Sequence, residues 1–487
     1  MSLIPQTVPN LIAGEERLAV SKASAPKYNP ATGQELCALT ASQAEDINAA
    51  VDAALVAQPQ WAAIPPVQRG MILHQACDAL HSRREDMARI VALETGKSFQ
   101  DALGETMGAI ALGRFYAGEG QRLYGRTTTS GAQNKYAMTI RQPVGLAGLI
   151  IAANTPIANV AWKVFPALIC GNAALLKASE DAPATAWFFG SLVQDLFPAG
   201  TLAVLQGLGR EAGAPLVEHP QVDVISFTGS TPVGREIAEV AGRRLAKVSL
   251  ELGGKNAFVV CDDADLDNAV SWAVLSVFSN AGQRCASAGR IVVFESVYEE
   301  FRDKLLAATQ QLNLGTDDGD DLGPVINAES LQRMLGVITQ AKAEGARILC
   351  GGDRLHDPDH ANGYYMAPTV IEGAAPDAAI SRTELFGPIA CLYPAKDFAQ
   401  ALDLVNDSPY GLTAAIHSRN FNRAWEFAQR VATGVVSING ATYGSEPHMP
   451  FGGRKDSGNG SREPGTEALD IYSDLKDVYI MSNPEAV

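Results

Sequence analysis

The sequence predicts an α/β protein built around a doubly wound parallel sheet. Between residues 144 and 250, short apolar runs alternate with stretches of helical period, which is the pattern of successive βαβ units. Clusters of Gly, Pro, Asn and Ser separate these runs, and a second region of the same kind follows up to about residue 457. The 487 residues are enough for roughly two to four domains.

The first 120 residues are predicted to form short strands and then a helical layer. Residues 1–41 have the composition of loops and short strands. The motif Ser42-Gln-Ala-Glu45 predicts a capping box at the start of a helix. Further helices are expected over Arg69–Leu80 and Arg84–Thr95, the second ended by Gly96. No residue of this layer suggests a chemical role.

The parallel sheet is predicted from residue 144 onward. Strands are expected at 144–152, 173–177, 202–206, 222–227 and 247–250, with helices at 157–170 and 184–196 and a third capped by Thr231 and begun by Pro232. Such sheets bind ligands at the carboxyl ends of their strands. Three motifs stand at those ends: Asn154, Lys177-Ala-Ser-Glu180 and Phe227-Thr-Gly-Ser230. The third precedes a helix, where free N–H groups favour an anion, although a plain turn before a capped helix is an equal alternative.

The stretch from Leu250 to Cys285 contains the strongest candidates for catalysis. It opens with Glu251-Leu-Gly-Gly-Lys255 and closes with Gly282-Gln-Arg-Cys285. Between them we expect a strand at 257–260 and a helix from about residue 266 to Asn280, which leaves Cys285 on the following loop. A carboxylate can act as a base and a thiolate as a nucleophile. Either residue alone is more often an ordinary surface carboxylate or a small buried thiol.

The remaining elements complete a second α/β region and a terminal strand. Strands are expected at 291–294 and 435–439, helices at 298–312 and 421–431, and turns at Glu384-Leu-Phe-Gly-Pro388 and Pro450-Phe-Gly-Gly453. Residues 135–142 look like an exposed strand, and 471–480 alternates like a strand that needs a partner sheet. Unpaired strand edges favour association, so an oligomer is expected.

Composition excludes several classes of partner. The net charge is −16 and the basic residues are scattered, which argues against nucleic acid and anionic membranes. The apolar stretch 144–176 is interrupted by Asn, Lys and Pro, so we expect no membrane span. Seven widely spaced cysteines without a Cys-x-x-Cys motif argue against a disulfide framework and against a metal site. With no signal peptide in residues 1–10, a reducing cytoplasm is the expected location.

Seven motifs in one order resemble the aldehyde dehydrogenase superfamily, whose members oxidise aldehydes to acids with NAD(P). The resemblance covers nearly the whole chain. The motifs are Asn154-x-Pro156, Lys177-x-x-Glu180, Phe227-Thr-Gly-Ser230, Glu251-Leu-Gly-Gly254, Gly282-Gln-x-Cys285, Glu384-x-Phe386-Gly-Pro and Pro450-Phe-Gly-Gly453 with Lys455, Ser457 and Gly458. Each motif is weak alone, but their order is specific.

The resemblance implies a role for four catalytic residues. Cys285 would attack the aldehyde to give a thiohemiacetal, and Asn154 with the Cys285 N–H would hold the oxyanion. Loss of hydride to the nicotinamide would give a thioester, and Glu251 would activate the water that hydrolyses it. Lys163 matches a family lysine implicated in the proton network, although by itself it would more often be a surface residue of an amphipathic helix.

The resemblance also implies the domains and the cofactor residues. It places an NAD-binding domain at 1–122 and 144–252, a catalytic α/β domain at 253–456, and a small β oligomerisation arm at 123–143 and 467–487, in a homodimer or homotetramer. The residues implied in cofactor binding are Lys177, Glu180, Gly229, Ser230, Leu252, Glu384 and Phe386. The carboxylate of Glu180 would repel a 2′-phosphate, which favours NAD over NADP.

One departure from the family pattern concerns the substrate. Most members have Pro-Trp-Asn-Phe-Pro where this chain has Ala152-Ala153-Asn154-Thr155-Pro156, so two aromatic side chains are lost. The candidate pocket residues are Thr155, Asn159, Trp162, Ser279, Arg284 and His448. The set is more polar than usual, so we expect a hydroxylated, sugar-derived or semialdehyde substrate. Arg284 and His448 would suit an anionic one, although Arg284 could instead form a structural salt bridge.

Four other interpretations remain open from the sequence. An aromatic aldehyde is an alternative substrate. A CoA-acylating semialdehyde dehydrogenase would share the fold, but Glu251 argues for water as the acceptor of the acyl group. A catalytically silent binding protein would not need Cys285, Glu251 and Asn154 together. The sequence does not exclude NADP as the cofactor.

Overall fold

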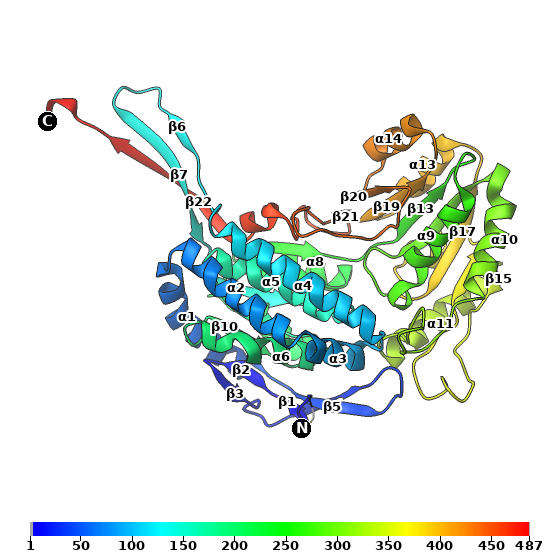
Figure 1. Cartoon of the computed structure of the whole chain (residues 1–487), viewed down its shortest axis with the longest axis horizontal. Helices are drawn as coiled ribbons and strands as arrows, with labels where there is room; N and C mark the ends of the chain where they lie inside the picture. Colours follow the sequence, from blue (N-terminus) through cyan, green and yellow to red (C-terminus); the bar gives the residue numbers. More distant parts are fainter. Residues whose placement is uncertain (1–2, 487) are drawn as a thin grey trace.

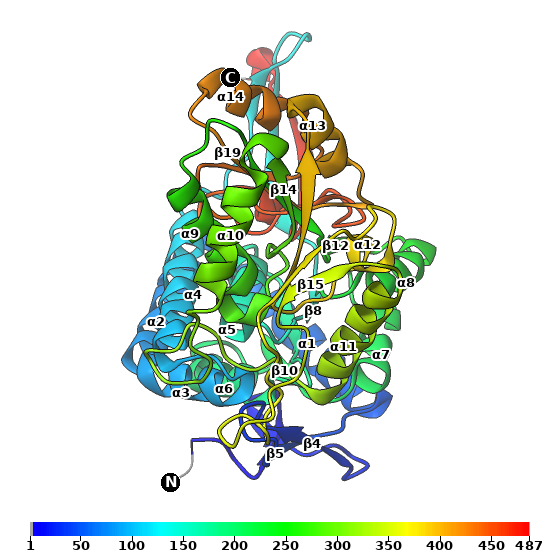
Figure 2. The same cartoon turned by 90° about the vertical axis from the view of Figure 1, so that its right-hand side faces the viewer.

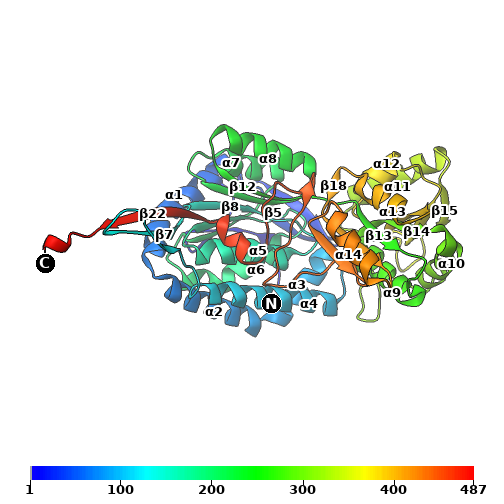
Figure 3. The same ribbon diagram turned by 90° about the horizontal axis from the view of Figure 1, so that it is seen from above.

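Two seven-stranded sheets organise residues 3–486, the part of the chain that this computed structural model describes (Figure 1). Each sheet forms the centre of one half of the molecule, and a narrow β arm extends from the first half. The junction between the two halves contains the candidate functional site. Figure 3 shows the two halves side by side with the arm at the far end of the first.

The first sheet is the predicted doubly wound parallel sheet. Its strand order is β12-β11-β8-β9-β10-β2-β3, and the first five strands are parallel. The parallel strands are β8 (Leu146–Ile150), β9 (Ala173–Lys177), β10 (Leu202–Leu205), β11 (Val224–Thr228) and β12 (Lys247–Glu251). The antiparallel β2 (Asn10–Ile12) and β3 (Glu15–Arg17) extend its edge, which the sequence did not predict individually.

Helices cover both faces of the first sheet (Figure 3). One face holds α1 (Ala44–Ala63), α7 (Ala214–Glu218) and α8 (Thr231–Arg243). The other holds α2 (Pro66–Ser82), α3 (Arg84–Thr95), α4 (Phe99–Glu119), α5 (Pro156–Ile169) and α6 (Pro183–Val193). As predicted, α3 ends at Gly96, which adopts the left-handed conformation with a φ of 76°.

The two predicted helix caps are each displaced by one residue. Helix α1 begins after Gln43, whose N–H donates to the Asp46 carboxylate at 3.0 Å, so the predicted Ser42–Glu45 capping box is wrong. The Ser42 hydroxyl instead pairs with the buried side chain of Asn10. Similarly, Ser230 rather than Thr231 occupies the N-cap position of α8, although its side chain forms no capping hydrogen bond. The Thr231 hydroxyl instead donates to the Asp456 carbonyl.

The second sheet has the order β15-β16-β17-β14-β13-β19-β20, with every neighbouring pair parallel except β15 and β16. Its strands are β13 (Asn256–Val260), β14 (Ala288–Phe294), β15 (Arg347–Cys350), β16 (Thr369–Glu372), β17 (Ile389–Ala395), β19 (Thr413–His417) and β20 (Val435–Ile438). Helices α9 (Leu266–Phe278) and α10 (Tyr298–Thr309) cover one face. Helices α11 (Ala328–Ala343), α12 (Ala379–Arg382), α13 (Phe398–Asn406) and α14 (Phe421–Arg430) cover the other (Figure 2).

The remaining strands form three small sheets. At the N-terminal edge, β1 (Thr7–Val8), β5 (Glu35–Thr40) and β4 (Ser24–Tyr28) form one sheet, while β18 (Tyr410–Gly411) pairs with β21 (Arg454–Lys455). The arm consists of β6 (Thr127–Thr129), β7 (Lys135–Pro143) and β22 (Ser473–Met481). The last strand thus finds its partner, β7, within the same chain. No helix within residues 3–486 is long and apolar enough to cross a membrane.

The segment after β21 returns from the second half to the first sheet. The Asn459 side chain accepts from the Leu250 N–H and donates to the Val248 carbonyl, and Gly458 forms a bridge with Glu251. Further along, the Glu463 carboxylate accepts from Ser226 and Ser249, in the middle of β11 and β12. This segment therefore ties the two halves together beside the last residue of β12.

Candidate active site

A strained turn holds Cys285 at the junction between the halves. Helix α9 ends at Phe278, and the next turn contains three consecutive left-handed residues: Asn280, Ala281 and Gly282, with φ of 55°, 52° and 67°. A side chain on Gly282 would collide with the Gly387 carbonyl, so the turn requires glycine there. As predicted, Cys285 follows α9 on a loop, where it is only partly buried.

Two cavities meet at Cys285. The larger has a volume of about 480 Å³ and the smaller about 260 Å³. Among the described residues, those that line both are Asn154, Thr155, Trp162, Cys285 and Phe451. The sulfur therefore lies where a molecule in one cavity could approach a molecule in the other.

The smaller cavity lies at the carboxyl ends of strands β11 and β12. Its lining includes seven residues with predicted roles beyond those it shares with the larger: Asn159, Gly229, Ser230, Glu251, Leu252, Glu384 and Phe386. Ser230 is the N-cap residue of α8, and its side chain forms no capping hydrogen bond with the first N–H groups of the helix. The structure thus brings Asn154, Glu251 and Cys285 to one cavity.

Glu251 is a buried carboxyl group without a partner. It ends β12 with 4% exposure, and neither carboxylate oxygen forms a hydrogen bond within residues 3–486. Burial raises its pKa well above the usual range, repulsion from Glu463 raises it further, and Lys163 and Arg462 partly oppose the shift. A carboxyl group of this kind can take a proton from water at neutral pH.

Cys285 is held as a thiol in the isolated site. Burial raises its pKa to about 12, with added repulsion from Glu384 and Glu251, whereas the Arg284 guanidinium lowers it. Because the thiolate is the nucleophile, the sulfur needs a base or further positive charge before it can attack. Glu251 and Glu384 are the carboxylates that line the same cavity, and Arg284 is the neighbouring positive charge.

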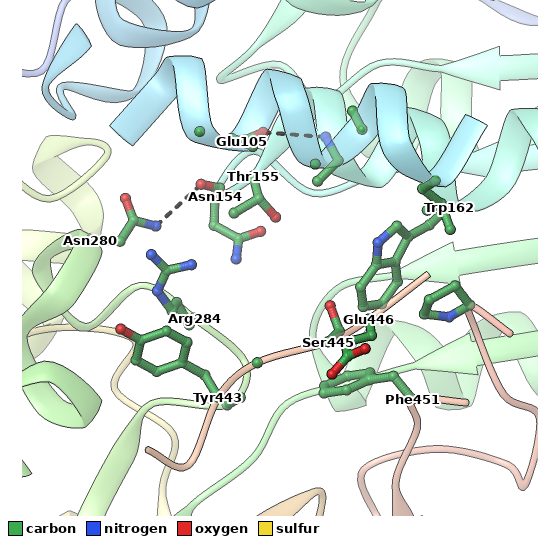
Figure 4. Close-up of a pocket in the computed structure, with 18 of the residues that line it drawn as sticks. Glu105, Asn154, Thr155, Trp162, Asn280, Arg284, Tyr443, Ser445, Glu446 and Phe451 are labelled. Carbon is green, nitrogen blue, oxygen red and sulfur yellow. Dashed lines mark hydrogen bonds between the residues drawn. The ribbon is translucent and has the colours of Figure 1, made fainter. Parts of the chain in front are cut away.

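Asn154 is anchored through both its side chain and its main chain. Its side-chain amide donates to the Gln283 carbonyl at 2.9 Å. Its main-chain carbonyl accepts from Lys97 Nζ at 2.9 Å. The same carbonyl accepts from Asn280 Nδ2 at 3.2 Å, as Figure 4 shows. The residue therefore links the end of β8 to the loop that precedes Cys285.

Lys163 is fully buried, so its interpretation as a surface residue is wrong. Its ammonium donates to Ser226 Oγ at 2.6 Å and to the Glu463 carboxylate at 2.8 Å. It lines neither cavity. Any influence on the site passes through Glu463 and the electrostatic interaction of both groups with Glu251.

The larger cavity lies between α4, α5 and the loop 443–447 (Figure 4). Arg284 lies over the Tyr443 ring, 4.7 Å from its centre, and its Nε donates to Ser279 Oγ at 3.3 Å. No carboxylate among residues 3–486 lies within ion-pair distance of Arg284, so the alternative of a structural salt bridge is wrong. Trp162 and Phe451 form the apolar end of the cavity, with Glu446 beside them (Figure 4).

Besides Lys163, four other predicted residues line neither cavity. Ser279 serves as the acceptor for Arg284, and the His448 side chain is 60% exposed beside Glu446. Lys177 ends β9 with a buried ammonium that pairs with Glu180 at 3.2 Å, and burial lowers its pKa. Glu180 is half-exposed. Both lie at the carboxyl edge of the first sheet, near the smaller cavity's strands.

The sequence did not reveal several polar residues of the larger cavity. Lys97, Glu105, Asn280 and Tyr443 line it, and none belongs to a motif that the sequence singled out. From the sequence, Asn280 was predicted only as the end of a helix. The positions of the other three residues depend on how α4 and the loop 443–447 pack. No group of three or more His, Cys, Asp or Glu side chains within residues 3–486 is arranged to hold a metal ion.

Comparisons with known proteins agree with this geometry. Residues 19–478 match the model of the Aldehyde dehydrogenase family. The chain is 35% identical over 486 residues to the α-ketoglutaric semialdehyde dehydrogenase of Bacillus subtilis, covering 99% of this chain and 100% of that one. The betaine aldehyde dehydrogenase of Staphylococcus aureus, solved with NAD⁺, superposes with a TM-score of 0.96 at 31% identity, covering 99% and 96%. An Escherichia coli NADP-dependent enzyme gives 0.94 at 35%, covering 99% of both chains.

Proposed function

The chain belongs to the aldehyde dehydrogenase family, and from this premise we propose that it oxidises an anionic, polar aldehyde to the carboxylic acid with NAD and water. The observation that best supports the proposal is the meeting of two cavities at Cys285, with Asn154 beside it and Glu251 in one of them. That arrangement provides a nucleophile, an oxyanion donor and a base at one point.

The chemistry on the sulfur follows from these residues. The Cys285 thiolate adds to the aldehyde carbon and forms a C–S bond, and the carbonyl electrons move to the oxygen. The Asn154 amide and the Cys285 N–H would donate to that oxygen, each donor worth roughly 3–4 kcal/mol. Loss of hydride from this carbon would leave a thioester on Cys285, and a nicotinamide dinucleotide bound in the smaller cavity would supply the hydride acceptor.

Glu251 completes the cycle as the base. It removes a proton from water, the water oxygen bonds to the thioester carbon, and the C–S bond breaks to release the acid. The two unpartnered oxygens of Glu251 are available to accept that proton. The proton that Glu251 has accepted then passes to solvent or to the Cys285 sulfur that the acyl group has left.

The residues around the smaller cavity fit a dinucleotide. The N-terminus of α8, which has no side-chain cap, would provide N–H groups for the pyrophosphate, with Gly229 and Ser230 at the turn. A side chain on Gly253 would collide with the Glu384 carboxylate, so the backbone stays open beside a group that can accept from ribose hydroxyls. Phe386 would pack against the ring, and Leu252 lines the same wall.

We propose NAD rather than NADP because of Glu180. Its carboxylate is half-exposed and bonded to Lys177 at the end of β9. A ribose with two free hydroxyls can donate to this carboxylate, whereas a 2′-phosphate would be repelled.

The proposed substrate carries an anionic group because of Arg284. Its guanidinium lines the larger cavity beside Cys285, stacked on Tyr443 and without a carboxylate partner among the described residues. A planar guanidinium binds a carboxylate through two parallel hydrogen bonds. The similarity to an α-ketoglutaric semialdehyde dehydrogenase supports the same class, because that aldehyde carries one carboxylate.

An aromatic aldehyde is the second candidate. Trp162, Tyr443 and Phe451 line the larger cavity, and the rings of Trp162 and Phe451 meet edge to face with centres 5.3 Å apart. An aromatic ring of a substrate could pack against them. A CoA-acylating reaction is disfavoured, since Glu251 would have no function when CoA resolves the thioester.

A panel of aldehydes tests the proposal. Semialdehydes with a carboxylate, neutral alkanals and benzaldehydes are compared by kcat/KM for NADH formation, with and without CoA. We expect semialdehydes to be oxidised fastest, free acid as the product, and no activity in Cys285→Ala. A preference for alkanals contradicts the substrate class, and NADH formation by Cys285→Ala contradicts the mechanism.

We also propose the domain division 1–122 with 144–252, 253–456, and 123–143 with 467–487, the last as an arm that joins copies into a dimer or tetramer. The arm exposes Tyr136, Leu475, Tyr479 and Met481, which supports association. Light scattering on the purified protein tests it. Seven free cysteines in the described chain support a cytoplasmic location.

A further inference from the structure

A buried ion pair on the helical layer contacts the main chain of Asn154. Lys97 Nζ lies 2.6 Å from a Glu105 carboxylate oxygen, and the two side chains are only 5% and 7% exposed. Both line the larger cavity. Two buried charges lose hydration, which is repaid only when further hydrogen bonds satisfy them. Lys97 and Glu105 each form such hydrogen bonds, and the partners in all of them belong to the segment that begins with Asn154.

Glu105 supplies the cap that α5 lacks. The N-cap residue of α5, Thr155, forms no side-chain capping hydrogen bond, and Pro156 has no N–H group. The Glu105 carboxylate accepts instead from the N–H groups of Ile157 at 3.0 Å and Ala158 at 3.3 Å. A carboxylate at this end also interacts favourably with the helix dipole. The start of α5 is therefore fixed by α4.

Lys97 continues the chain of contacts to Asn154. The same ammonium that pairs with Glu105 donates to the Asn154 carbonyl at 2.9 Å. Asn280 Nδ2 donates to this carbonyl from the other half of the molecule and also to the Gln283 carbonyl, both at 3.2 Å. The main chain of Asn154 is thus held from two sides.

Asn280 also leaves the Asn154 amide free to move. That amide donates to the Gln283 carbonyl, which Asn280 already satisfies. The amide can therefore turn toward an oxygen on the carbon bonded to Cys285 without leaving a buried carbonyl unpaired, which would cost about 1–3 kcal/mol. A fixed main chain with a releasable amide is what an oxyanion donor needs.

We propose that Lys97 and Glu105 are positioning residues that hold Asn154 as the oxyanion donor, with Asn280 keeping the Gln283 carbonyl satisfied when the amide turns. This rests on the proposed function, in which Asn154 donates to the oxyanion. The pair acts through Asn154 and does not touch the reacting carbon.

A double-mutant cycle tests the proposal. Lys97→Met, Glu105→Gln and Asn154→Ala are made singly, and each of the first two is combined with the third. We expect Asn154→Ala to reduce the rate of the first NADH turnover about 100-fold or more, and Lys97→Met or Glu105→Gln about 10- to 100-fold. In the Asn154→Ala background the other two should have no further effect, because they act through one residue. The Kd of NAD and the alkylation rate of Cys285 should stay unchanged.

The outcomes distinguish failure of the positioning role of Lys97 and Glu105 from failure of the proposed function. If the effects of Lys97→Met and Asn154→Ala multiply, Lys97 acts on the substrate directly and the proposal is overturned. No loss in Lys97→Met and Glu105→Gln overturns it as well. No loss in Asn154→Ala shows that the proposed function itself is wrong about the oxyanion. Phe301→Leu, a core change on α10, is the control for reduced stability alone and should leave the first turnover unchanged.

Discussion

The guanidinium of Arg284 lies 4.7 Å from the centre of the Tyr443 ring and next to Cys285 at the bottom of the larger cavity. Stacking on an aromatic ring orients a guanidinium while its N–H groups stay available. The side chain is therefore held ready to bind an anion, and no carboxylate of the described chain competes for it.

Arg284→Met should raise KM for a carboxylate-bearing aldehyde about 10- to 100-fold, because a charge-assisted hydrogen bond is worth roughly 1.5–3 kcal/mol. The KM for a neutral aldehyde should change little. Initial rates of NADH formation measure both. Arg284→Lys, which keeps the charge, is the control. Its KM for the carboxylate-bearing aldehyde should lie between those of the native protein and Arg284→Met. Equal losses for both aldehydes would show that Arg284 does not select the anion.

Glu251→Gln should separate the two halves of the reaction. Without a base, the thioester should form but hydrolyse about 100- to 10,000-fold more slowly. A rapid-mixing experiment should show one NADH per site in a burst, followed by slow turnover, and mass spectrometry should detect the acyl group on Cys285. Loss of the burst would instead assign Glu251 to the first step, as the base for the thiol.

The reactivity of Cys285 should respond in opposite directions to its acidic and its basic neighbours. Glu251 and Glu384 raise the pKa of the thiol and Arg284 lowers it. Glu251→Gln should therefore lower the pKa and Arg284→Met should raise it, and one pKa unit changes the thiolate fraction about tenfold. Iodoacetamide alkylation between pH 7 and 10 measures the shift, with Arg284→Lys expected near the native profile. A shift of the same sign in both variants would contradict the assignment.

The affinity for the dinucleotide should increase with pH between 6 and 8. Burial raises the pKa of Glu384 to about 7, opposed by the Gly254 N–H, Lys255 and Arg333. Below pH 7 the carboxyl group is protonated and accepts ribose hydroxyls poorly, so Kd should rise, up to about tenfold per pH unit. NADH fluorescence titrations check this. Glu384→Gln should bind more weakly at pH 8 and show no such pH dependence.

Glu180→Gln should improve the use of NADP relative to NAD. The change removes the negative charge that would face the ribose in the proposed complex and retains a polar side chain. We expect the ratio of kcat/KM for NAD over NADP to fall about tenfold or more, mainly through the KM for NADP. Glu236→Gln, on the exposed side of α8, is the matched control. An unchanged ratio would show that another group sets the preference.

The residues that local patterns define were predictable from the sequence. Glu251 ends a strand, Ser230 precedes a helix and Cys285 follows one, so the rule that ligands bind at the carboxyl ends of parallel strands placed them correctly. The parallel arrangement of the first sheet was predicted from the same alternation, whereas its strand order was not.

Other residues depend on packing that no local pattern encodes. Helix α5 is buried on nearly every side, so its period shows no polar face from which the burial of Lys163 could be deduced. Lys97 reaches Asn154 only because α4 packs against α5. His448 stands near the Phe451 motif in sequence, yet its loop turns it to solvent.

Only a handful of the described residues border both cavities, and the loop 443–447 borders the larger one alone. Substitutions in this loop can therefore change which aldehyde is accepted without altering the residues of the smaller cavity, where the dinucleotide is proposed to bind. Related enzymes with this fold can thus acquire different substrates while Cys285, Asn154 and Glu251 stay unchanged.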